Sequence, residues 1–530
     1  MTRLIVFVLA TASAFAQQGV ESSAMLASPG DSWPTYNGDY SGRRYSPIDQ
    51  INKSNIRLLS LAWAYHTGLS QVKSTPLVVD GIMYFTVPDH VWAIDARTGR
   101  EIWHYKYTSN GGDHIGNRGV GMYKNWLYFE TPDCHLVCLN ARDGSERWKV
   151  ELGDVKLGYF ATMAPLIIRN HVIVGVSGDV TDIPGYLESH DPETGKMQWR
   201  WYTAPKPGEA GSETWPNGSD AIFHGGGMTW MTGTYDPELN LLYWGTGNPN
   251  PVLAGEGRRG ANLYTCSIVA LDPTTGKLVW SFQPSPHDLH DWDAVQTPIL
   301  FDGDFDGHKR RLIAQASRNG YFFVLDRATG KHLLTKPFIE TNWAKGIDDN
   351  GRPIRDTRKD PAPDGSLVSP GSDGATNWLA PSYSPQSGLF YVSARHLWSI
   401  FYLTAVGKAE GWGGRDRNLY ADSTVRAIDY KTGKIRWTHD IGNGEGTAGI
   451  LTTAGNLLFT ADNTGLLMAW DSTSGETLWH VNIGAHVGNS PMTYKVDGRQ
   501  YLVFAAGESL YAFALPESVV AQAVSPAHAR

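Results

Sequence analysis

One short pattern recurs along most of this chain of 530 residues: an acidic residue, two spacers, Thr-Gly, three spacers and Trp. Five copies follow it closely, and they begin at Asp95, Asp191, Asp272, Asp429 and Asp471. Two further copies are degenerate, since the one at Asn140 begins with an amide and the one at Asp326 lacks the Trp. A chain built on such a repeat is expected to fold as a series of similar units.

Each copy of the pattern has a direct physical meaning. Its Asp and Thr side chains can hydrogen-bond the backbone of a turn, and its Gly supplies a positive φ angle. An apolar run such as Val91–Ile94 precedes the turn, and the Trp follows it. Each copy therefore predicts a β-hairpin with an aromatic anchor.

The spacing of the copies predicts the architecture. Successive copies begin 45, 51, 81, 54, 103 and 42 residues apart. Periods of about 40–50 residues are typical of propeller blades with about four strands each, and we assign the two long gaps to insertions or an unmarked blade. Seven copies, with a strand at Trp63 before the first, predict an all-β fold that is an eight-bladed β-propeller with Trp-docking repeats.

Composition and the chain ends narrow the class of protein. The net charge is −8 without a basic block, so we expect no nucleic-acid partner. Residues 1–16 combine Arg3, an apolar run and a small-residue stop, as a cleavable secretory signal peptide does. No later run is long and apolar enough to span a membrane. We expect a propeller domain at 17–515, a C-terminal tail at 516–530, and a periplasmic product.

The densest polar cluster in the sequence is 285–293, which reads Ser-Pro-His-Asp-Leu-His-Asp-Trp-Asp. A solvated loop is the simplest interpretation, and a zinc site built from His287 and His290 is a further one. Two other polar residues lie in distinctive motifs before and after the cluster. Asn248 lies upstream in a Gly/Pro turn, and Arg318 lies downstream at the predicted end of a strand.

At these residues the chain resembles the quinoprotein alcohol dehydrogenases that use pyrroloquinoline quinone (PQQ), of the methanol/ethanol dehydrogenase type. The resemblance runs from about Trp33 to Leu515 and includes the Trp-bearing repeats. Its other anchors are the motifs GGGMTW, GTGNP, PHDLHDWD, SRNGYFFVLDR and TNW, in this order.

The resemblance implies a set of cofactor-binding residues. The carboxylates and carbonyls of PQQ would be held by Arg118, Thr162, Ser177 and Gly178. Trp230 would form the floor on which the planar quinone stacks, and Asn377 would reach the quinone edge. Arg318 would hydrogen-bond the reacting carbonyl oxygens.

The resemblance also implies a base and a metal site. Asp291 would be the general base that takes the alcohol proton. The metal ligands would be Asn248, Asp291, Asp293 and Asp179. A hard cation prefers such oxygen ligands and polarises the quinone carbonyl.

Simpler roles stay open for three of these residues. Trp230 is one of 20 Trp residues and could pack between blades. Arg318 could be a structural ion-pair partner, and Asn248 could simply satisfy a turn. Their occurrence together favours the functional interpretation.

Several positions depart from the family pattern. Lys73 stands where a Glu is expected, and Gly111-Gly112 replace two adjacent cysteines. Met228 replaces a Thr, and Thr447 replaces a Trp. The mouth of the site and the identity of the alcohol therefore do not follow from the resemblance.

The metal ligands depart from the pattern too. The expected metal-binding Glu falls on Val180, which cannot bind a metal, so Asp179 would take its place, with Asp182 as a second candidate. Asp293, two positions after the base, resembles a residue of the lanthanide-dependent members, whose third positive charge it helps to compensate. Two carboxylates are typical of the calcium type and three of the lanthanide type. A lanthanide is slightly favoured, with calcium as the alternative.

Three hypotheses follow. The first is an exported quinoprotein that oxidises a primary alcohol or related hydroxyl compound. It would pass electrons to a separate periplasmic cytochrome c, because the sequence contains no C-x-x-C-H haem-attachment motif. The second is a non-catalytic propeller that acts as a binding or assembly scaffold. The third is a degenerate quinoprotein that binds PQQ with little activity, which Lys73 and Val180 would explain. The sequence does not indicate an oligomeric state.

Overall fold

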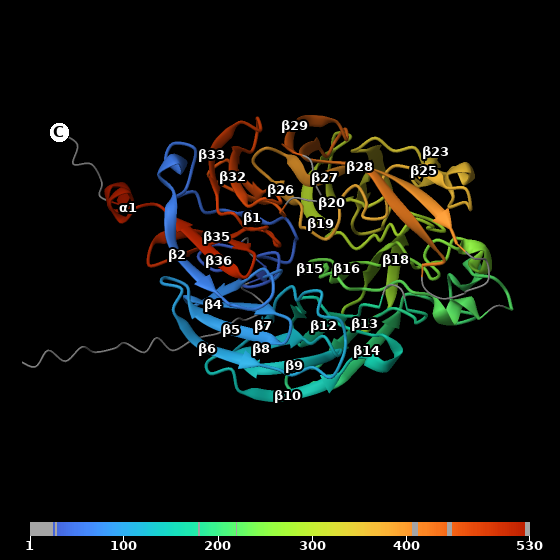
Figure 1. Ribbon diagram of the computed structural model, residues 1–530, viewed down its shortest axis with the longest axis horizontal. Coiled ribbons are helices and arrows are strands. Elements are labelled where there is room, and N and C mark those ends of the chain that lie inside the picture. Colours follow the sequence, from blue (N-terminus) through green and yellow to red (C-terminus); the bar gives the residue numbers. More distant parts are fainter. Residues whose placement is uncertain are drawn as a thin grey trace, which may run out of the picture.

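The computed structural model describes residues 25–26, 29–178, 181–218, 220–404, 412–442 and 448–524. In these residues it contains eight sheets of four or five strands, one two-stranded sheet, one α-helix and six short 3-10 helices. The large sheets follow one another around a common centre in chain order (Figure 1). The fold is an all-β propeller, as predicted, and the eight large sheets are consistent with the expected eight blades.

The first four large sheets each contain four consecutive antiparallel strands. Sheet 1 consists of β3 (Leu77–Val79), β4 (Ile82–Val87), β5 (His90–Asp95) and β6 (Glu101–Lys106). Sheet 2 consists of β7 (Gly121–Tyr123), β8 (Trp126–Glu130), β9 (His135–Asn140) and β10 (Glu146–Glu151). Sheet 3 consists of β11 (Leu166–Ile168), β12 (His171–Gly175), β13 (Tyr186–His190) and β14 (Met197–Tyr202). Sheet 4 consists of β15 (Thr234–Asp236), β16 (Leu241–Gly245), β17 (Ile268–Leu271) and β18 (Leu278–Phe282).

The other four large sheets complete the ring. Sheet 5 consists of β19 (Ile299–Phe305), β20 (His308–Ala316), β21 (Tyr321–Asp326) and β22 (His332–Pro337). Sheet 6 consists of β25 (Ser366–Val368), β26 (Ser382–Ser384), β27 (Leu389–Leu403), β28 (Gly414–Asp429) and β29 (Ile435–Gly442). Sheet 7 consists of β1 (Tyr45–Ser46), β30 (Leu451–Thr453), β31 (Leu457–Ala461), β32 (Leu466–Asp471) and β33 (Thr477–Asn482). Sheet 8 consists of β34 (Met492–Val496), β35 (Arg499–Ala506), β36 (Ser509–Ala514) and β2 (Ser60–His66).

The remaining elements lie outside the large sheets. The two-stranded sheet consists of β23 (Ala344–Ile347) and β24 (Pro353–Arg355). The 3-10 helices are η2 (Ile56–Leu58), η3 (Val155–Leu157), η4 (Ser212–Thr214), η5 (Ala221–His224), η6 (Gly255–Arg258) and η7 (Thr357–Lys359). The α-helix α1 (Glu517–Val524) follows the last strand, in the segment expected to be a C-terminal tail. Residues 1–16, the expected signal peptide, lie outside the described residues.

Burial within each sheet follows the position of the strand. The two middle strands are buried along most of their length, as in β8 and β9, because neighbouring sheets cover both of their faces. The outer strands β6 and β10 alternate between exposed and half-buried residues. An outer strand therefore presents one face to the next sheet and the other face to solvent.

The predicted aromatic anchors join neighbouring sheets. Trp103 on β6 packs on the turn of sheet 2, where a methyl group at Gly144 would lie 2.7 Å from the indole ring. Its Nε1 donates a hydrogen bond of 3.0 Å to the Ala141 carbonyl in the same turn. Five more Trp–Gly pairs of this kind occur among the described residues: Trp63–Gly99, Trp148–Gly195, Trp199–Gly276, Trp280–Gly330 and Trp437–Gly475.

The copy beginning at Asp326 has Leu334 at the position of the Trp, so the contact with the following sheet is made by other side chains. Gly433, in the turn of sheet 6, faces the aliphatic part of Lys336 on β22, and Leu334 lies beside it. The Thr-Gly turn therefore keeps its close approach to the preceding sheet, with an alkyl chain in place of the indole.

The N-terminal part of the chain closes the ring. Strand β2 pairs antiparallel with β36, so that Trp63 lies opposite Ala512, and the first and last parts of the chain form one sheet. Figure 1 shows β2 beside β35 and β36. Before β2, the chain adds β1 to sheet 7 and buries Arg44, which donates to the carbonyls of Tyr36 and Pro491.

Candidate active site

One cavity brings together residues from widely separated parts of the chain. It has a volume of about 230 Å³ and is lined by Lys73, Ile115, Gly116, Arg118, Phe160, Thr162, Ser177, Trp230, Asp291, Arg318, Asn377 and Trp378. Seven of the residues that the resemblance singled out are among them. These are Arg118, Thr162, Ser177, Trp230, Asp291, Arg318 and Asn377.

The topology explains why these residues meet. In an antiparallel sheet, the start of the first strand and the end of the second strand lie at the same end. Arg118 and Thr162 shortly precede the first strands of sheets 2 and 3, and Ser177 follows the second strand of sheet 3. Trp230 precedes sheet 4, and Arg318 follows the second strand of sheet 5. All five therefore project from one end of the inner strands.

Trp230 is fixed at one wall of the cavity. Its indole Nε1 donates a hydrogen bond of 3.0 Å to Oδ2 of Asp293. The Arg118 guanidinium lies over the ring, 4.7 Å from its centroid. Trp230 also belongs to the core that joins the first four sheets, so it packs between blades and faces the cavity as well.

Cationic and hydroxyl groups line the neighbouring wall. Arg118 Nη1 donates hydrogen bonds to Oγ1 and to the carbonyl of Thr162. The Thr162 and Ser177 hydroxyls lie 3.5 Å apart, and the Arg118 guanidinium also contacts Trp378, at 5.0 Å from its ring centroid. An aromatic wall beside cations and hydroxyl donors suits a planar ring with carboxylate substituents, so these residues fit PQQ.

Arg318 binds the two predicted carboxylates. Its Nη2 donates to Oδ2 of Asp291 at 2.9 Å, and its Nη1 lies 3.1 Å from Oδ2 of Asp293. Nη2 also donates to the Ser372 carbonyl at 2.7 Å. Arg318 is thus an ion-pair partner, as the simpler interpretation required, but its partners are the acidic residues of the predicted site.

Asp293 is almost fully enclosed. Its Oδ1 accepts a hydrogen bond of 2.6 Å from the Asn248 backbone amide, and its Oδ2 accepts from Trp230. Burial raises the pKa of the Asp293 carboxyl, while Arg318 and these hydrogen-bond donors lower it. The carboxylate therefore organises the floor of the cavity in addition to any role as a ligand.

Asp291 is presented by a strained loop. Its φ angle is +65°, in the left-handed region that Asp tolerates better than most residues. Asp288 holds this loop, because its Oδ2 accepts hydrogen bonds from the backbone amides of His290 and Trp292 at 3.3 and 3.1 Å. Burial raises the pKa of Asp288 to about 6.

The other aromatic residues of the cluster have structural contacts. His290 stacks on Trp292 with centroids 4.3 Å apart, and the Trp292 Nε1 donates to the Gly371 carbonyl. His287 has a ring nitrogen 2.8 Å from the Gly260 carbonyl. Burial lowers the pKa of both histidines to about 3. Over the described parts of the chain, no group of three or more His, Cys, Asp or Glu residues could hold a metal ion, so the zinc interpretation gains no support.

Three of the predicted metal ligands lie in the described part of the chain. Arg318 joins the carboxylates of Asp291 and Asp293, and the Asn248 backbone amide bonds to Asp293, so the three residues are neighbours, but Asn248 and Asp293 are not among the residues that line the cavity. Their side chains carry amide and carboxylate oxygen atoms. Such oxygens are the ligand type that a hard cation prefers, and the donor set fits a calcium or lanthanide ion in kind. Asp179 and Val180 lie outside the described residues.

Two further predictions concern the edge of the site. Gly178 is not among the residues that line the cavity, and it packs instead against Thr181 and Ile183. Asn377 does line the cavity, and its side-chain amide donates to the Asp373 carbonyl at 3.1 Å. Thr447, where a Trp was expected, lies outside the described part of the chain.

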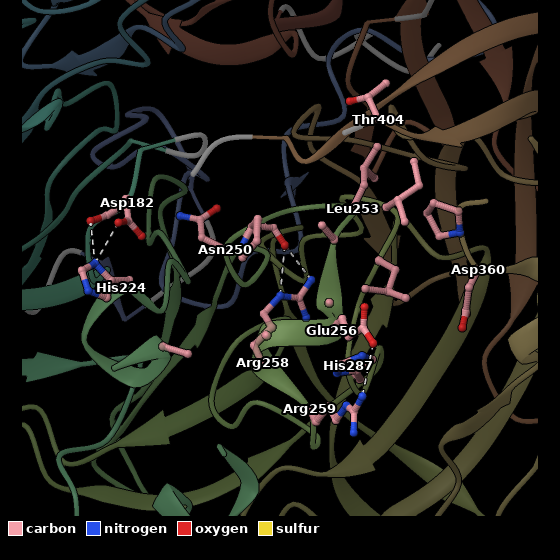
Figure 2. A pocket seen from close by; sticks show the side chains of 18 of the residues that line it. Asp182, His224, Asn250, Leu253, Glu256, Arg258, Arg259, His287, Asp360 and Thr404 are labelled. Carbon is pink, nitrogen blue, oxygen red and sulfur yellow. Dashed lines mark hydrogen bonds and ion pairs between the residues drawn. The ribbon is translucent and has the colours of Figure 1, made fainter. Parts of the chain in front are cut away.

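A larger cavity of about 840 Å³ lies next to this region. It contains Asp182, the second candidate for the missing ligand, whose carboxylate lies 2.9 Å from Nδ1 of His224. Figure 2 shows this pair at one side of the cavity and Asp360 at the other. None of the seven predicted residues lines this cavity, so its size does not make it the better candidate for the chemistry.

Sequence reasoning missed some residues of the smaller cavity. Phe160 and Ile115 had not been singled out, and no motif marks them. Trp378 could have been identified from the sequence, because it is the last residue of the motif TNW. Lys73 had been noticed as a departure from the family, and the structure places it in the cavity wall.

Comparisons with known proteins agree with this site. The family model for the β-propeller domain of glucose, ethanol and alcohol dehydrogenases matches residues 33–342. A second model, for the outer membrane protein assembly factor BamB, matches residues 421–517.

Individual relatives match over most of their length. The quinohemoprotein alcohol dehydrogenase of Comamonas testosteroni is 37% identical over 96% of this chain and 79% of its own. The quinoprotein alcohol dehydrogenase PedH of Pseudomonas putida is 36% identical over 88% of this chain and 84% of its own. A solved europium-containing methanol dehydrogenase superposes with a TM-score of 0.83 at 30% identity, over 93% of this chain and 99% of its own. This chain therefore belongs to the family of PQQ-dependent alcohol dehydrogenases and is an oxidoreductase.

Proposed function

We propose that this protein oxidises a primary alcohol, or a related hydroxyl compound, with PQQ and one metal ion as cofactors. The observation that carries the proposal is the small cavity, in which an aromatic wall, two arginines and a carboxylate from five different sheets and loops meet. The topology brings these positions together, and the stacking, cationic and carboxylate side chains found at them suit a planar anionic cofactor.

Cofactor binding is assigned to the residues of this cavity. Trp230 is the stacking surface, and Arg118, Thr162 and Ser177 are the groups that bind carboxylates and carbonyls. Asn377 would contact the ring edge, and Gly178, which does not line the cavity, would contribute through its place next to Ser177. When bound, PQQ supplies the carbon atom that accepts a hydride from the alcohol.

The protein's own residues control the proton and the charge. Asp291, a carboxylate at the cavity wall, accepts the hydroxyl proton of the alcohol as its carbon atom loses the hydride. The alcohol thereby becomes the aldehyde, with one proton and one hydride removed. Arg318 positions Asp291 through the 2.9 Å hydrogen bond, and its positive charge stabilises negative charge on oxygen atoms next to it.

The metal ion is assigned to Asn248, Asp291 and Asp293, with Asp179 as the replacement for the missing Glu. A lanthanide is slightly favoured over calcium, because Asp179 would add a third carboxylate. Arg318 contacts both described carboxylates, so the guanidinium and the ion would share them.

The cellular setting follows from the same proposal. Residues 1–16 would act as a signal peptide, the propeller would span 17–515 and the tail 516–530, and the enzyme would work in the periplasm. Among the described residues, no helix has the length and apolar character needed to cross a membrane. A separate cytochrome c would accept the electrons.

A scaffold role is the alternative from another class. The match to the BamB family model covers 421–517, a region that contains the last strand of sheet 6 and most of sheets 7 and 8 but none of the proposed site residues. That match reflects the shared repeat, so it does not favour a scaffold function over an enzyme. A quinoprotein that binds PQQ with little turnover is the second alternative.

Reconstitution tests the proposal. The purified mature chain would be incubated with PQQ and either calcium or lanthanum, and quinone absorbance and dye reduction would be followed with a panel of alcohols. Stoichiometric uptake with turnover is the expected result, and the more effective ion identifies the metal. Uptake without turnover would indicate the degenerate quinoprotein, and no uptake with either ion would indicate the scaffold.

A further inference from the structure

Lys73 is a cation in the wall of the proposed cofactor cavity, at a position where the family resemblance leads one to expect a Glu. Its side chain is half-buried, and its Nζ donates a hydrogen bond of 2.6 Å to the Ile115 carbonyl. An ammonium group has three donors, so this contact leaves further N–H groups for a ligand.

Gly116 makes room for this side chain. A methyl group at Gly116 would lie 2.7 Å from Cδ of Lys73, which is closer than carbon atoms can approach without displacement. The residue next to the Ile115 anchor therefore lacks a side chain at the place where the lysine stem passes. The ammonium group can therefore reach the cavity wall, where it hydrogen-bonds the Ile115 carbonyl.

The charge balance at this end of the cavity is positive. Among the described residues Lys73 forms no ion pair, whereas Arg318 at the other end binds both Asp291 and Asp293. Burial and the nearby Arg118 charge both lower the pKa of Lys73. Both effects therefore destabilise the cationic form of its ammonium group. An anion bound beside Lys73 and Arg118 would offset that destabilisation.

The arrangement of the ring places this cation away from the reacting groups. Lys73 precedes sheet 1 and the segment 115–118 precedes sheet 2, whereas Asp291 and Arg318 flank the first strands of sheet 5. In a ring of eight sheets, the first and fifth lie on opposite sides. A planar ligand whose quinone end faces Asp291 therefore presents its opposite end to Lys73.

We propose that Lys73 is a cofactor-binding residue, whose ammonium group binds a carboxylate of PQQ jointly with the Arg118 guanidinium. Lys73 thereby makes this cavity selective for an anionic ring over a neutral ring of the same shape. The proposal rests on the proposed function, since it assumes that PQQ is the cofactor.

Affinity measurements on the apoprotein test this assignment without relying on turnover. Quenching of Trp fluorescence would give the dissociation constants of PQQ and of its neutral trimethyl ester for the wild type, Lys73→Gln, Lys73→Glu and Lys73→Arg. Loss of one charge-assisted hydrogen bond is expected to weaken PQQ binding about 10-fold in Lys73→Gln. Lys73→Glu, which restores the residue that the resemblance leads one to expect, should also weaken it, because it removes the same cation. Lys73→Arg should stay within about 3-fold of the wild type, since it keeps the charge.

The neutral ester and a distant lysine provide the controls. Ester binding should be nearly the same in all variants, because the ester carries no carboxylate charge. Lys277 is exposed and outside the cavity, so Lys277→Gln should bind PQQ like the wild type. Melting temperatures of the apoproteins would confirm that each variant is folded.

The outcomes separate this inference from the proposed function. If the wild type binds PQQ and Lys73→Gln and Lys73→Glu bind it equally well, Lys73 is not a carboxylate ligand, and the proposed function stands. An equal loss of PQQ and ester binding would assign Lys73 to cavity structure and would also overturn the inference. If the wild type does not bind PQQ, both the proposed function and this inference are wrong.

Discussion

Arg318 links the acidic residues of the proposed site to each other. Its guanidinium binds Asp291 and Asp293, and Asp293 in turn orients Trp230 through the indole Nε1. A linked set of this kind keeps the proposed base, the positive charge and the aromatic wall in fixed relation. Substitution of any one member by a residue that cannot make its contact is therefore expected to alter its neighbours as well.

The residue identities could be predicted from the sequence, whereas their contacts could not. The motifs located Asp291, Arg318 and Trp230 because residue type and order are visible in one dimension. That Asp293 bonds to Trp230 depends on side chains 63 positions apart in the chain. The replacement of the expected Glu by Val180 or Asp179 stays a prediction, because both residues lie outside the described parts.

Asp291→Asn is the sharpest test at the scale of one residue. The amide keeps the shape of the carboxylate but cannot accept the alcohol proton, so kcat is expected to fall at least about 100-fold. Uptake of PQQ and the melting temperature should change little, because the side chain remains a hydrogen-bond acceptor for Arg318. Dye-linked alcohol oxidation measures the first effect, and quinone absorbance measures the second. Unchanged turnover would remove Asp291 from the role of base.

At the scale of elements, the repeated hairpins are the units that the sequence predicts best. The turn beginning at Asp95 joins β5 and β6 as expected, because Asp, Thr and Gly fix its conformation locally. The partner of each Trp could not be read from one copy, since the indole contacts the Gly of the following sheet. The same limit applies to β23 and β24, which lie in the long gap between the copies at Asp326 and Asp429 and which no repeat marks.

Gly276→Ala tests the docking contact between sheets 3 and 4. Gly276 has a φ angle of +69°, and a methyl group there would lie 2.6 Å from the Trp199 ring. Gly307 is the matched control, because its φ angle is +76° and a methyl group there would have no neighbour within 4 Å. Gly307→Ala should cost about 1 kcal/mol from the left-handed conformation alone.

The difference between the two variants isolates the docking contact. Gly276→Ala should cost about 1–3 kcal/mol more than the control, because the Trp199 ring must move from its position in the core. Denaturant unfolding of both variants measures the difference. Equal losses of stability would show that the close approach of Trp199 contributes nothing beyond the turn conformation.

At the scale of the whole molecule, the ring is closed by strands from opposite ends of the chain. The periodicity placed a strand at Trp63 before the first repeat, but its pairing with β36 involves almost the full chain length. No local pattern encodes that pairing; it follows from the number of sheets and the need to cover both edges. The cavity depends on this closure, because Lys73 lies between β2 and β3.

Trp63→Ala tests the closure against an equivalent contact elsewhere. Trp63 on β2 packs on Gly99 and donates a hydrogen bond of 3.1 Å to the Ala96 carbonyl. Trp280 makes the same kind of contact with Gly330 and donates to the Arg327 carbonyl at 3.2 Å, and both indoles are buried. Each substitution to Ala should cost about 3–5 kcal/mol, because each removes a buried indole.

The two variants should differ in where the chain opens. Strand β2 is held on one side by β36 and on the other by the docking of Trp63, so Trp63→Ala should free it locally. Limited proteolysis below the melting temperature, followed by mass spectrometry, should then show early cleavage between β2 and β3 in this variant alone. Sheet 4, which contains Trp280, is continuous in the chain with sheet 5, so Trp280→Ala should give no such N-terminal cut. The same first cleavage site in both variants would mean that the closing sheet opens no more readily than the rest of the ring.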